Sequence, residues 1–267
     1  PHFPAVLLNL IDSAERLSIQ VHPDKKRARE LFHSDYGKTE CWHILGGRTV
    51  DGQSPCLYLG FRPGITREKW RLLFDRQDIA GMLDSMHRFD VKKGDTFLIE
   101  GGTPHAIGAG CFLTEIQEPT DYTIRVERST PSGLRIADSM CHQGLGFVKM
   151  MDCFDYTGYT REQIREKRQI PSRRIGEQEG VVRTRIIGYE RTAMFQMDSL
   201  RVASAGRLTG QGVFSVLYVL AGRGTLTCGG REIGLCPGRQ VFLPARMAGC
   251  GLRADTPLEL LQCFGPQ

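Results

Sequence analysis

Apolar and polar residues alternate over short stretches of this chain, as they do in β-strands. In residues 17–22 the alternation places Ser18, Gln20 and His22 on one face and apolar side chains on the other. Further short apolar runs predict strands at residues 41–45, 56–61, 96–99, 112–117, 122–126, 214–220, 224–228, 240–243 and 258–263. The pattern therefore predicts an all-β protein.

Helical periodicity is confined to a few segments. A short polar helix is expected at residues 24–32, and a second helix begins at Thr66. Apolar residues in 79–86 recur with the spacing of one helix face, and we expect them to pack against the strands rather than to bind a ligand. A further helix is expected at residues 161–168. These segments predict a helical insertion in a β domain.

The second half of the chain resembles the first. An offset of 144 residues pairs Gly94 with Gly238 and Glu115 with Glu259, but it sets His105 against Gly249. Glycine- and proline-rich stretches at 221–224, 228–230 and 237–238 predict hairpins there. We therefore expect two related β-barrels, of which only the first binds a metal.

The same pattern suggests where the domains begin and end. Residues 1–155 are expected to form the catalytic, metal-binding domain and residues 191–267 a second β domain without a metal site. Between them, residues 156–190 are rich in charge and are predicted to be a linker with some helix.

Composition excludes several classes of protein. Among 267 residues there is no run of 18 apolar residues and no signal-peptide pattern, so no membrane partner is expected. The net charge of +5 is mild, and the basic residues between Arg161 and Arg185 alternate with glutamates, so no nucleic-acid partner is expected. Because the chain starts at Pro1 rather than at Met, we expect the natural protein to begin upstream.

The nine cysteines form no C-x-x-C pair, and several lie in apolar runs, for example Cys56, Cys111 and Cys263. Buried, reduced thiols in a cytoplasmic protein are the expected state.

Four residues form a candidate metal site. Gln20 and His22 share a strand face, Glu40 lies at the start of the next strand, and His105 stands in Gly102-Thr-Pro-His-Ala at the end of a glycine-bracketed strand. Two imidazoles and a carboxylate on rigid strands suit zinc or a similar divalent ion, with the amide of Gln20 as the fourth ligand. The sequence predicts one such ion per chain.

Three blocks of sequence carry a specific resemblance. Leu17-Ser-Ile-Gln-Val-His-Pro-Asp, Gly37-Lys-Thr-Glu-Cys-Trp and Gly102-Thr-Pro-His-Ala-Ile-Gly resemble the signature blocks of type I mannose-6-phosphate isomerases, in particular the short bacterial branch, within the cupin superfamily. The likeness covers residues 4–128 well. It implies two cupin-type (jelly-roll) barrels with a short helical insertion in the first. It also implies a zinc ion on the four candidate ligands and a cytoplasmic enzyme of carbohydrate metabolism.

The resemblance also implies a reaction and further site residues. Mannose 6-phosphate and fructose 6-phosphate would be interconverted through a cis-enediol, with Arg125 as the catalytic and substrate-binding arginine. Glu115 and Lys38 match pocket residues, and Ser18 matches a serine at the substrate phosphate. Glu115, Lys38 or a water molecule on the metal is the base, and Glu115 is preferred. Arg128 is interpreted as a surface arginine rather than as a phosphate contact.

The chain departs from the family in three places. Glu100 stands where the family commonly has proline, and the lysine that some longer members carry a few residues after the arginine is not matched within residues 126–131. We also expect the first several dozen residues of the family to be absent from this sequence. Two other functions stay open. One is a cupin isomerase or epimerase for another phosphosugar, and the other is a carbohydrate-sensing cupin without turnover. We expect a monomer or a weak homo-oligomer that acts on a small sugar phosphate.

Overall fold

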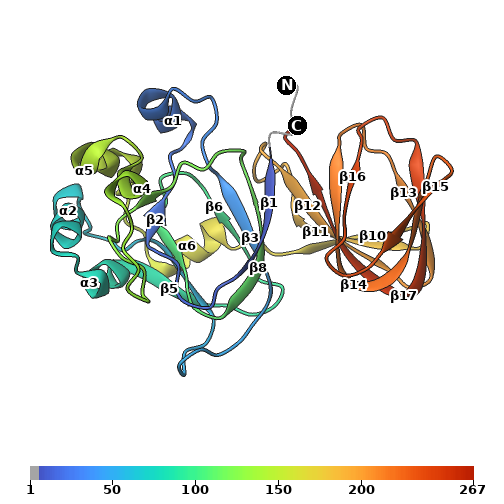
Figure 1. Cartoon of the computed structure of the whole chain (residues 1–267), viewed down its shortest axis with the longest axis horizontal. Helices are drawn as coiled ribbons and strands as arrows, with labels where there is room; N and C mark the ends of the chain where they lie inside the picture. Colours follow the sequence, from blue (N-terminus) through green and yellow to red (C-terminus); the bar gives the residue numbers. More distant parts are fainter. Residues whose placement is uncertain (1–5) are drawn as a thin grey trace. The chain divides into compact units, whose positions relative to one another are not determined.

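The structure, a computed structural model, describes residues 6–267. The chain folds into two compact units (Figure 1), an N-terminal unit of residues 9–170 and a C-terminal unit built on residues 171–267. The C-terminal unit consists of β-strands, and the N-terminal unit combines β-strands with the helices of the chain. Within the described residues, none of the helices has the length and apolar character needed to cross a membrane. The predicted all-β fold class with a helical insertion is confirmed.

The N-terminal unit is built from two β-sheets with a shared core. Its strands are β1 (Leu7–Asp12), β2 (Gln20–Val21), β3 (Glu40–Gly47), β4 (Cys56–Phe61), β5 (Met86–Asp90), β6 (Thr96–Ile99), β7 (His105–Ile107), β8 (Cys111–Gln117) and β9 (Ile124–Arg125). One sheet has the order β1-β8-β3-β6 and the other β5-β4-β7-β2-β9. Trp42 and Phe97 of the first sheet pack against Leu57 and Ile107 of the second, which fixes the two sheets face to face.

The helices of the N-terminal unit add a second apolar cluster. They are α1 (Lys25–Phe32), α2 (Arg67–Arg76), α3 (Ile79–Asp84), α4 (Asp138–His142), α5 (Gly146–Lys149), the 3-10 helix η1 (Met150–Cys153) and α6 (Arg161–Arg168). Side-chain caps at Asp24, Thr66 and Asp78 begin the first three. Met82 and Met86 are fully buried in this cluster, so the 79–86 stripe packs as predicted, although α3 ends at Asp84 and Met86 opens β5.

The segment predicted as a linker, residues 156–190, is divided between the two units. Helix α6 lies in the N-terminal unit, where Ile164 is buried in the core between the sheets. Arg168 at its end forms an ion pair with Glu100. Glu100 therefore contacts the end of α6, and its side chain is itself mostly exposed.

The C-terminal unit is a single curved sheet around an apolar core. Its strands are β10 (Arg173–Gln178), β11 (Val181–Ile187), β12 (Gln196–Val202), β13 (Ala205–Thr209), β14 (Ser215–Cys228), β15 (Arg231–Leu235), β16 (Gln240–Leu243) and β17 (Gly249–Phe264). The sheet order is β10-β11-β12-β17-β14-β15, with β13 on β17 and β16 on β14. Leu200, Val219 and Leu260 are fully buried inside it.

Two predictions for the C-terminal unit have different outcomes. Gly229 and Gly230, both with positive φ, form the predicted two-residue hairpin between β14 and β15. The turn predicted at residues 221–224 is wrong. Strand β14 runs through it and absorbs the extra residues as register shifts against β17. Glycines in a strand can mark such bulges as well as turns, and the sequence did not distinguish the two.

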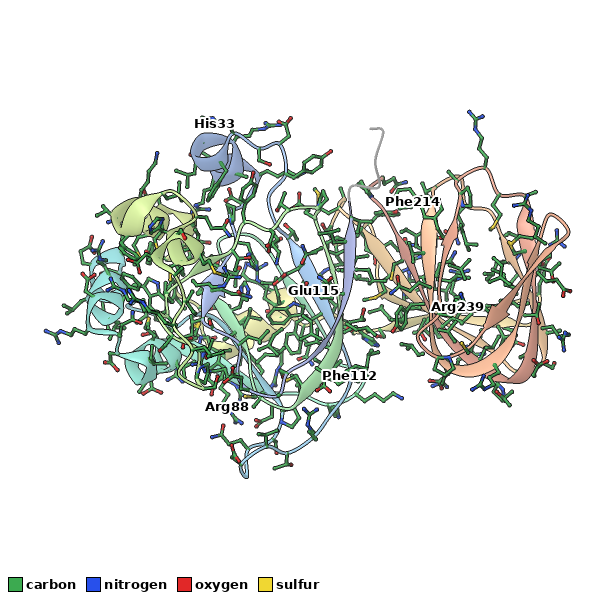
Figure 2. The ribbon with its side chains drawn as sticks, viewed as in Figure 1. His33, Arg88, Phe112, Glu115, Phe214 and Arg239 are labelled. Atoms are coloured by element: carbon green, nitrogen blue, oxygen red, sulfur yellow. A yellow bond between two sulfur atoms is a disulfide. The ribbon has the colours of Figure 1, made fainter. Side chains whose placement is uncertain are left out.

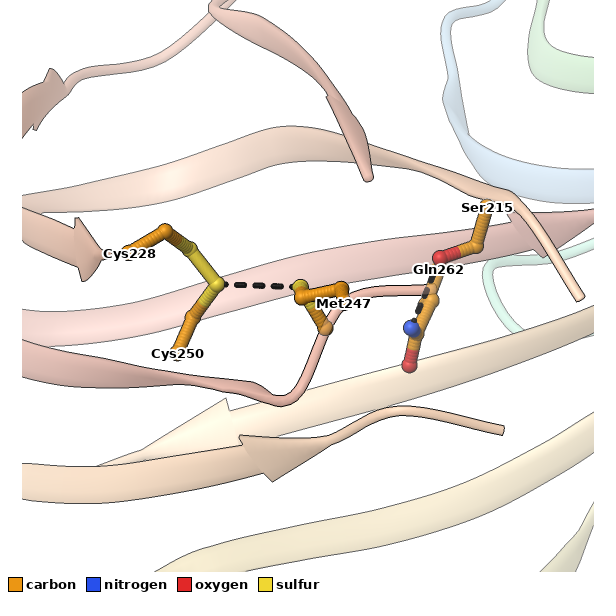
Figure 3. Close-up of a disulfide and its surroundings, with 5 residues drawn as sticks. All are labelled: Ser215, Cys228, Met247, Cys250 and Gln262. Atoms are coloured by element: carbon orange, nitrogen blue, oxygen red, sulfur yellow. Dashed lines mark hydrogen bonds between the residues drawn. A yellow bond between two sulfur atoms is a disulfide. The ribbon is translucent and has the colours of Figure 1, made fainter. Parts of the chain in front are cut away.

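The cysteine prediction also needs correction. Cys228 and Cys250 form a disulfide across β14 and β17, with Cα atoms 4.6 Å apart (Figure 3). Their pairing follows from strand register, because the adjacent residues Thr227 and Gly251 are direct cross-strand partners. The other cysteines form no disulfide: Cys41, Cys56, Cys111, Cys141, Cys153, Cys236 and Cys263.

Candidate metal centre

Three of the four predicted ligands converge in the N-terminal unit. The ligating atoms of His22, Glu40 and His105 all lie within 4.8 Å of one another. The Oε1 atom of Glu40 is 3.4 Å from Nε2 of His22 and 3.3 Å from Nε2 of His105. All three side chains are buried, with at most 1% exposed. They come from residues 18 to 83 positions apart in sequence, so the fold assembles them.

Glycines bring the three ligand segments together. A Cβ atom on Gly37 would lie 2.8 Å from the carbonyl oxygen of Pro23, and one on Gly101 would lie 2.5 Å from the backbone of Asp24. The N–H of Gly102 donates to the carbonyl oxygen of His22 over 2.7 Å. Only glycine permits such close backbone approach, so the segments before Glu40 and His105 can both pack on the segment after His22.

Both histidines present the same nitrogen to the centre. Nδ1 of His22 contacts the carbonyl oxygen of Tyr122 at 2.9 Å, and Nδ1 of His105 contacts that of Thr103 at 2.9 Å. A carbonyl only accepts, so each Nδ1 carries the proton and each Nε2 keeps a lone pair. Burial, and then the charge of Lys38, lower the pKa of His22. Burial and His22 lower the pKa of His105 to about 3. Both imidazoles are therefore neutral, and each can offer the lone pair of its Nε2 to a metal ion.

Glu40 is a buried carboxylate whose two oxygens differ. Its Oε2 accepts a hydrogen bond from Nζ of Lys38 at 3.0 Å, and the same Nζ lies 3.1 Å from Nε2 of His22. Burial raises the pKa of Glu40, but Lys38 and then His22 outweigh that effect and hold it well below its usual range. In the part of the chain that the structure describes, Oε1 of Glu40 and Nε2 of His105 are buried without a hydrogen-bond partner. Unpaired buried polar atoms are rare, and two facing each other fit a divalent cation.

Gln20, the fourth predicted ligand, lies beside the centre. In β2 it stands directly opposite His105 of β7 on one side and Arg125 of β9 on the other. Directly opposed residues in antiparallel strands share a face of the sheet, so Gln20 and His105 share theirs. Its amide as a ligand stays a prediction.

Glu115 projects from β8, opposite Trp42 of β3 (Figure 2). Its carboxyl group accepts hydrogen bonds from Nδ2 of Asn9 at 2.8 Å and from Nε1 of Trp42 at 3.1 Å. Burial, and then the charge of Glu40, raise the pKa of Glu115 to about 7. A fixed carboxyl group with a pKa near neutrality suits proton transfer. Asn9 and Trp42 were not predicted as site residues: Asn9 lies in no motif, and Trp42 closes the Gly37-Lys-Thr-Glu-Cys-Trp block, which was the available signal.

The predicted substrate-binding residues Arg125 and Ser18 lie on or next to strands of the second sheet. Arg125, in β9, donates through Nη1 to the carbonyl oxygens of Met140 at 3.1 Å and Thr123 at 3.4 Å. Ser18 is partly exposed, two residues before β2. Arg128 is exposed, and its guanidinium lies over the rings of Phe74 and Phe147, in agreement with its interpretation as a surface arginine.

The fold and this site define a two-unit β-protein with a buried candidate metal centre of two neutral imidazoles and one carboxylate. No family model matches the chain. A probable mannose-6-phosphate isomerase of Bacillus subtilis is 38% identical over 124 residues, 46% of this chain, and a mannose-6-phosphate isomerase of Streptococcus mutans is 35% identical over the same length. The matches cover 36% of the length of these curated relatives.

Solved structures show the same fold over nearly the whole chain. Mannose 6-phosphate isomerase from Bacillus subtilis has a TM-score of 0.75 at 23% identity, covering 97% of this chain and 74% of that one. A variant of phosphomannose isomerase from Salmonella typhimurium has a TM-score of 0.72 at 12% identity, covering 99% of this chain and 80% of that one. The resemblance to mannose-6-phosphate isomerases that the three motif blocks indicate is confirmed.

Proposed function

We propose that this protein interconverts mannose 6-phosphate and fructose 6-phosphate through a cis-enediol. The observation that carries the proposal is Glu115, a buried carboxyl group with a pKa of about 7, beside the His22, Glu40 and His105 centre. Isomerisation needs a base that moves a proton between adjacent carbons and a cation that stabilises the oxygen where negative charge develops. The relatives named mannose-6-phosphate isomerase support this choice of substrate.

We propose that one zinc ion per chain is held by His22, Glu40 and His105, with Gln20 as the fourth ligand. The fit rests on the two unpaired atoms, Oε1 of Glu40 and Nε2 of His105, and on the neutral state of both imidazoles. When bound, the ion would act as a Lewis acid toward the substrate oxygens.

Glu115 is the proposed base. Trp42 and Asn9 each donate to one of its oxygens and so hold the carboxyl plane in one orientation. In its ionised form it would take the proton from the carbon next to the carbonyl group and return it to the neighbouring carbon. Lys38 is less suited to this task, since its ammonium already donates to Glu40. We assign Lys38 to hydrogen bonding with the substrate and the carboxylate.

Arg125 and Ser18 are the proposed contacts for substrate charge. A guanidinium has five N–H donors and cannot lose its proton in this environment, so Arg125 can stabilise charge but not act as a base. Its Nη1 is fixed by backbone carbonyls, which aligns the rest of the group. Ser18 belongs to the polar face that contains Gln20 and His22, and we assign its hydroxyl to a substrate phosphate oxygen.

A coupled assay with metal analysis tests the function. We expect the zinc-loaded protein to convert mannose 6-phosphate, and we expect Arg125→Ala to keep its metal while losing about 10²–10³ in rate, as for other charge-stabilising groups. Arg128→Ala is the matched control, because its guanidinium lies on aromatic rings at the surface. Turnover only of another phosphosugar would indicate a different isomerase or epimerase. Sugar binding without turnover would indicate a sensor.

We propose a cytoplasmic location and a monomer or weak homo-oligomer. Buried cysteines without a disulfide, such as Cys56, Cys111 and Cys153, support a reducing compartment, and Cys228–Cys250 is the exception to that pattern.

A further inference from the structure

Glu118 is a buried carboxyl group that the proposed reaction does not use. It follows β8 directly and is only 2% exposed. Its Oε2 accepts the backbone N–H of Thr39 at 2.9 Å, while its own backbone N–H donates to the carbonyl oxygen of Thr39 at 3.0 Å. The side chain thus accepts the N–H of Thr39 in place of a backbone carbonyl group, just beyond the end of β8.

Thr39 is the residue between two groups of the metal centre. Lys38 and Glu40 lie on either side of it, and in an extended segment their side chains point to the same face. Both side chains meet at the centre, where Lys38 donates to Glu40. Fixing the peptide N–H and C=O of Thr39 therefore fixes the direction from which both side chains enter.

The surroundings of Glu118 hold the same segment. Nε2 of Gln117 donates to the carbonyl oxygens of Glu118 and Thr120, which shapes the loop after β8. The hydroxyl of Thr120 then donates to the carbonyl oxygen of Gly37 at 2.7 Å. These contacts lead from the loop to the residues just before Lys38.

The alternative role of Glu118 is an ion pair with Lys25 of α1. Their charged atoms are 3.9 Å apart, at the limit of an ion pair, and the Lys25 side chain is 46% exposed. Exposed pairs of this kind contribute little. Oε1, which faces Lys25, has no hydrogen-bond partner among the described residues, whereas Oε2 has a well-formed one. The geometry favours the contact with Thr39.

We propose that Glu118 is a positioning residue for the metal centre, which acts by holding Thr39 so that Glu40 and Lys38 face His22 and His105. The proposal rests on the proposed metal-dependent function, but metal binding itself provides a separate measurement. Residues that hold a metal ligand in place typically contribute about 10–100-fold to metal affinity.

The matched pair Glu118→Gln and Glu118→Met tests the proposal. Both side chains are close in size to glutamate, but only glutamine keeps an acceptor oxygen for the N–H of Thr39. We expect Glu118→Met to bind Zn²⁺ about 10–100-fold more weakly in a competition titration with a chromophoric chelator. We expect it to change the spectrum of bound Co²⁺ and to lower kcat more than it raises KM. Glu118→Gln should stay within about threefold of wild type on each readout.

Lys25→Met is the control for the ion pair. It removes the exposed ammonium and leaves the carboxyl group of Glu118 in place, so metal affinity should stay within about twofold of wild type. A Lys25→Met loss equal to that of Glu118→Met would overturn the proposal in favour of the ion pair.

Two further results would also overturn it: wild-type metal affinity in a folded Glu118→Met protein, or equal losses in Glu118→Gln and Glu118→Met. If Glu118→Met does not fold, Glu118→Asp replaces it. Aspartate withdraws the oxygen from Thr39 by one methylene group, and the same two outcomes decide. If wild type binds zinc but does not turn over mannose 6-phosphate, the proposed function fails, while the titrations still decide the role of Glu118.

Discussion

The two units each bury a carboxylate, but they treat it differently. In the C-terminal unit Asp198 is fully buried, and its oxygens accept hydrogen bonds from Arg183 at 2.8 Å and from Arg185 at 2.5 Å. In the N-terminal unit Glu40 is equally buried, but its Oε1 has two neutral imidazoles nearby and no hydrogen-bond donor within residues 6–267. The first arrangement is complete as it stands, and the second becomes complete only with a cation. The unpaired Oε1 of Glu40, facing the unpaired Nε2 of His105, therefore distinguishes this carboxylate from that of Asp198.

The two units treat their buried carboxylates differently although they share a backbone turn. In the N-terminal unit Gly94 donates to the carbonyl oxygen of Ile44, and in the C-terminal unit Gly238 donates to that of Val219. Both glycines have positive φ and precede a short strand, β6 or β16. The turn has thus been kept in both units, while the position of His105 corresponds to Gly249 by the 144-residue offset. Scaffold and chemistry vary independently in the two halves.

The largest expected effect comes from removing an imidazole. His105→Ala should abolish tight zinc binding and turnover, because a divalent ion would retain too few protein ligands. Metal content by elemental analysis and the coupled assay measure both. His33→Asn is the control, since His33 is exposed with positive φ, which asparagine tolerates. Full metal content in His105→Ala would refute its assignment as a ligand.

The second effect concerns Asp198, the buried carboxylate that already has its hydrogen-bond donors. Asp198→Ala should lower the unfolding free energy by about 3–5 kcal/mol, because it leaves the guanidinium groups of Arg183 and Arg185 mostly buried without a counter-ion. Denaturant unfolding measures this change, and zinc content should stay the same. Asp255→Ala, which breaks an exposed pair with Arg253, should cost only about 0–1 kcal/mol. Equal costs for the two variants would contradict the distinction drawn between them.

The smallest effect is a dependence on pH. Because the pKa of Glu115 is raised to about 7 from an ordinary value of 4.5, the folded, metal-free protein holds a proton that the unfolded chain releases. Its contribution to stability is full at low pH and is lost as pH rises from about 4.5 to about 7. Glu115→Gln should remove that slope. The lowered pKa values of His22 and His105 give a slope of the opposite sign, and they do so in both proteins. Urea unfolding of wild type and Glu115→Gln between pH 5 and 8 therefore isolates the contribution of Glu115.

The centre was largely predictable because strand alternation and glycine spacing are local signals. These signals indicate His22, Glu40 and His105 without any knowledge of the fold, and the resemblance adds Glu115. The role of Glu118 was not predictable, because it depends on a backbone N–H of another strand. Likewise, the pairing of Glu100 with Arg168 spans 68 residues and leaves no pattern in either segment.

Predictions for the C-terminal unit failed where one residue type serves two purposes. The glycines at 222 and 224 predict a turn, but β14 continues through them as a bulged strand. The many arginines and glutamates of residues 173–187 predict part of a linker, but β10 and β11 form there. Cys228 and Cys250 pair because two long strands place them opposite each other, which spacing along the chain does not reveal.

Gly37 and Gly101 both pack against the backbone of Pro23–Asp24, and this has a consequence for how such a site can evolve. A side chain at either glycine would displace the shared segment, and with it the donors that precede and follow it. A change in the spacing of these segments therefore requires the backbone of Pro23–Asp24 to move, whereas the exchange of one ligand type for another at a fixed position does not. We expect a lineage that changes its metal preference to take the second course.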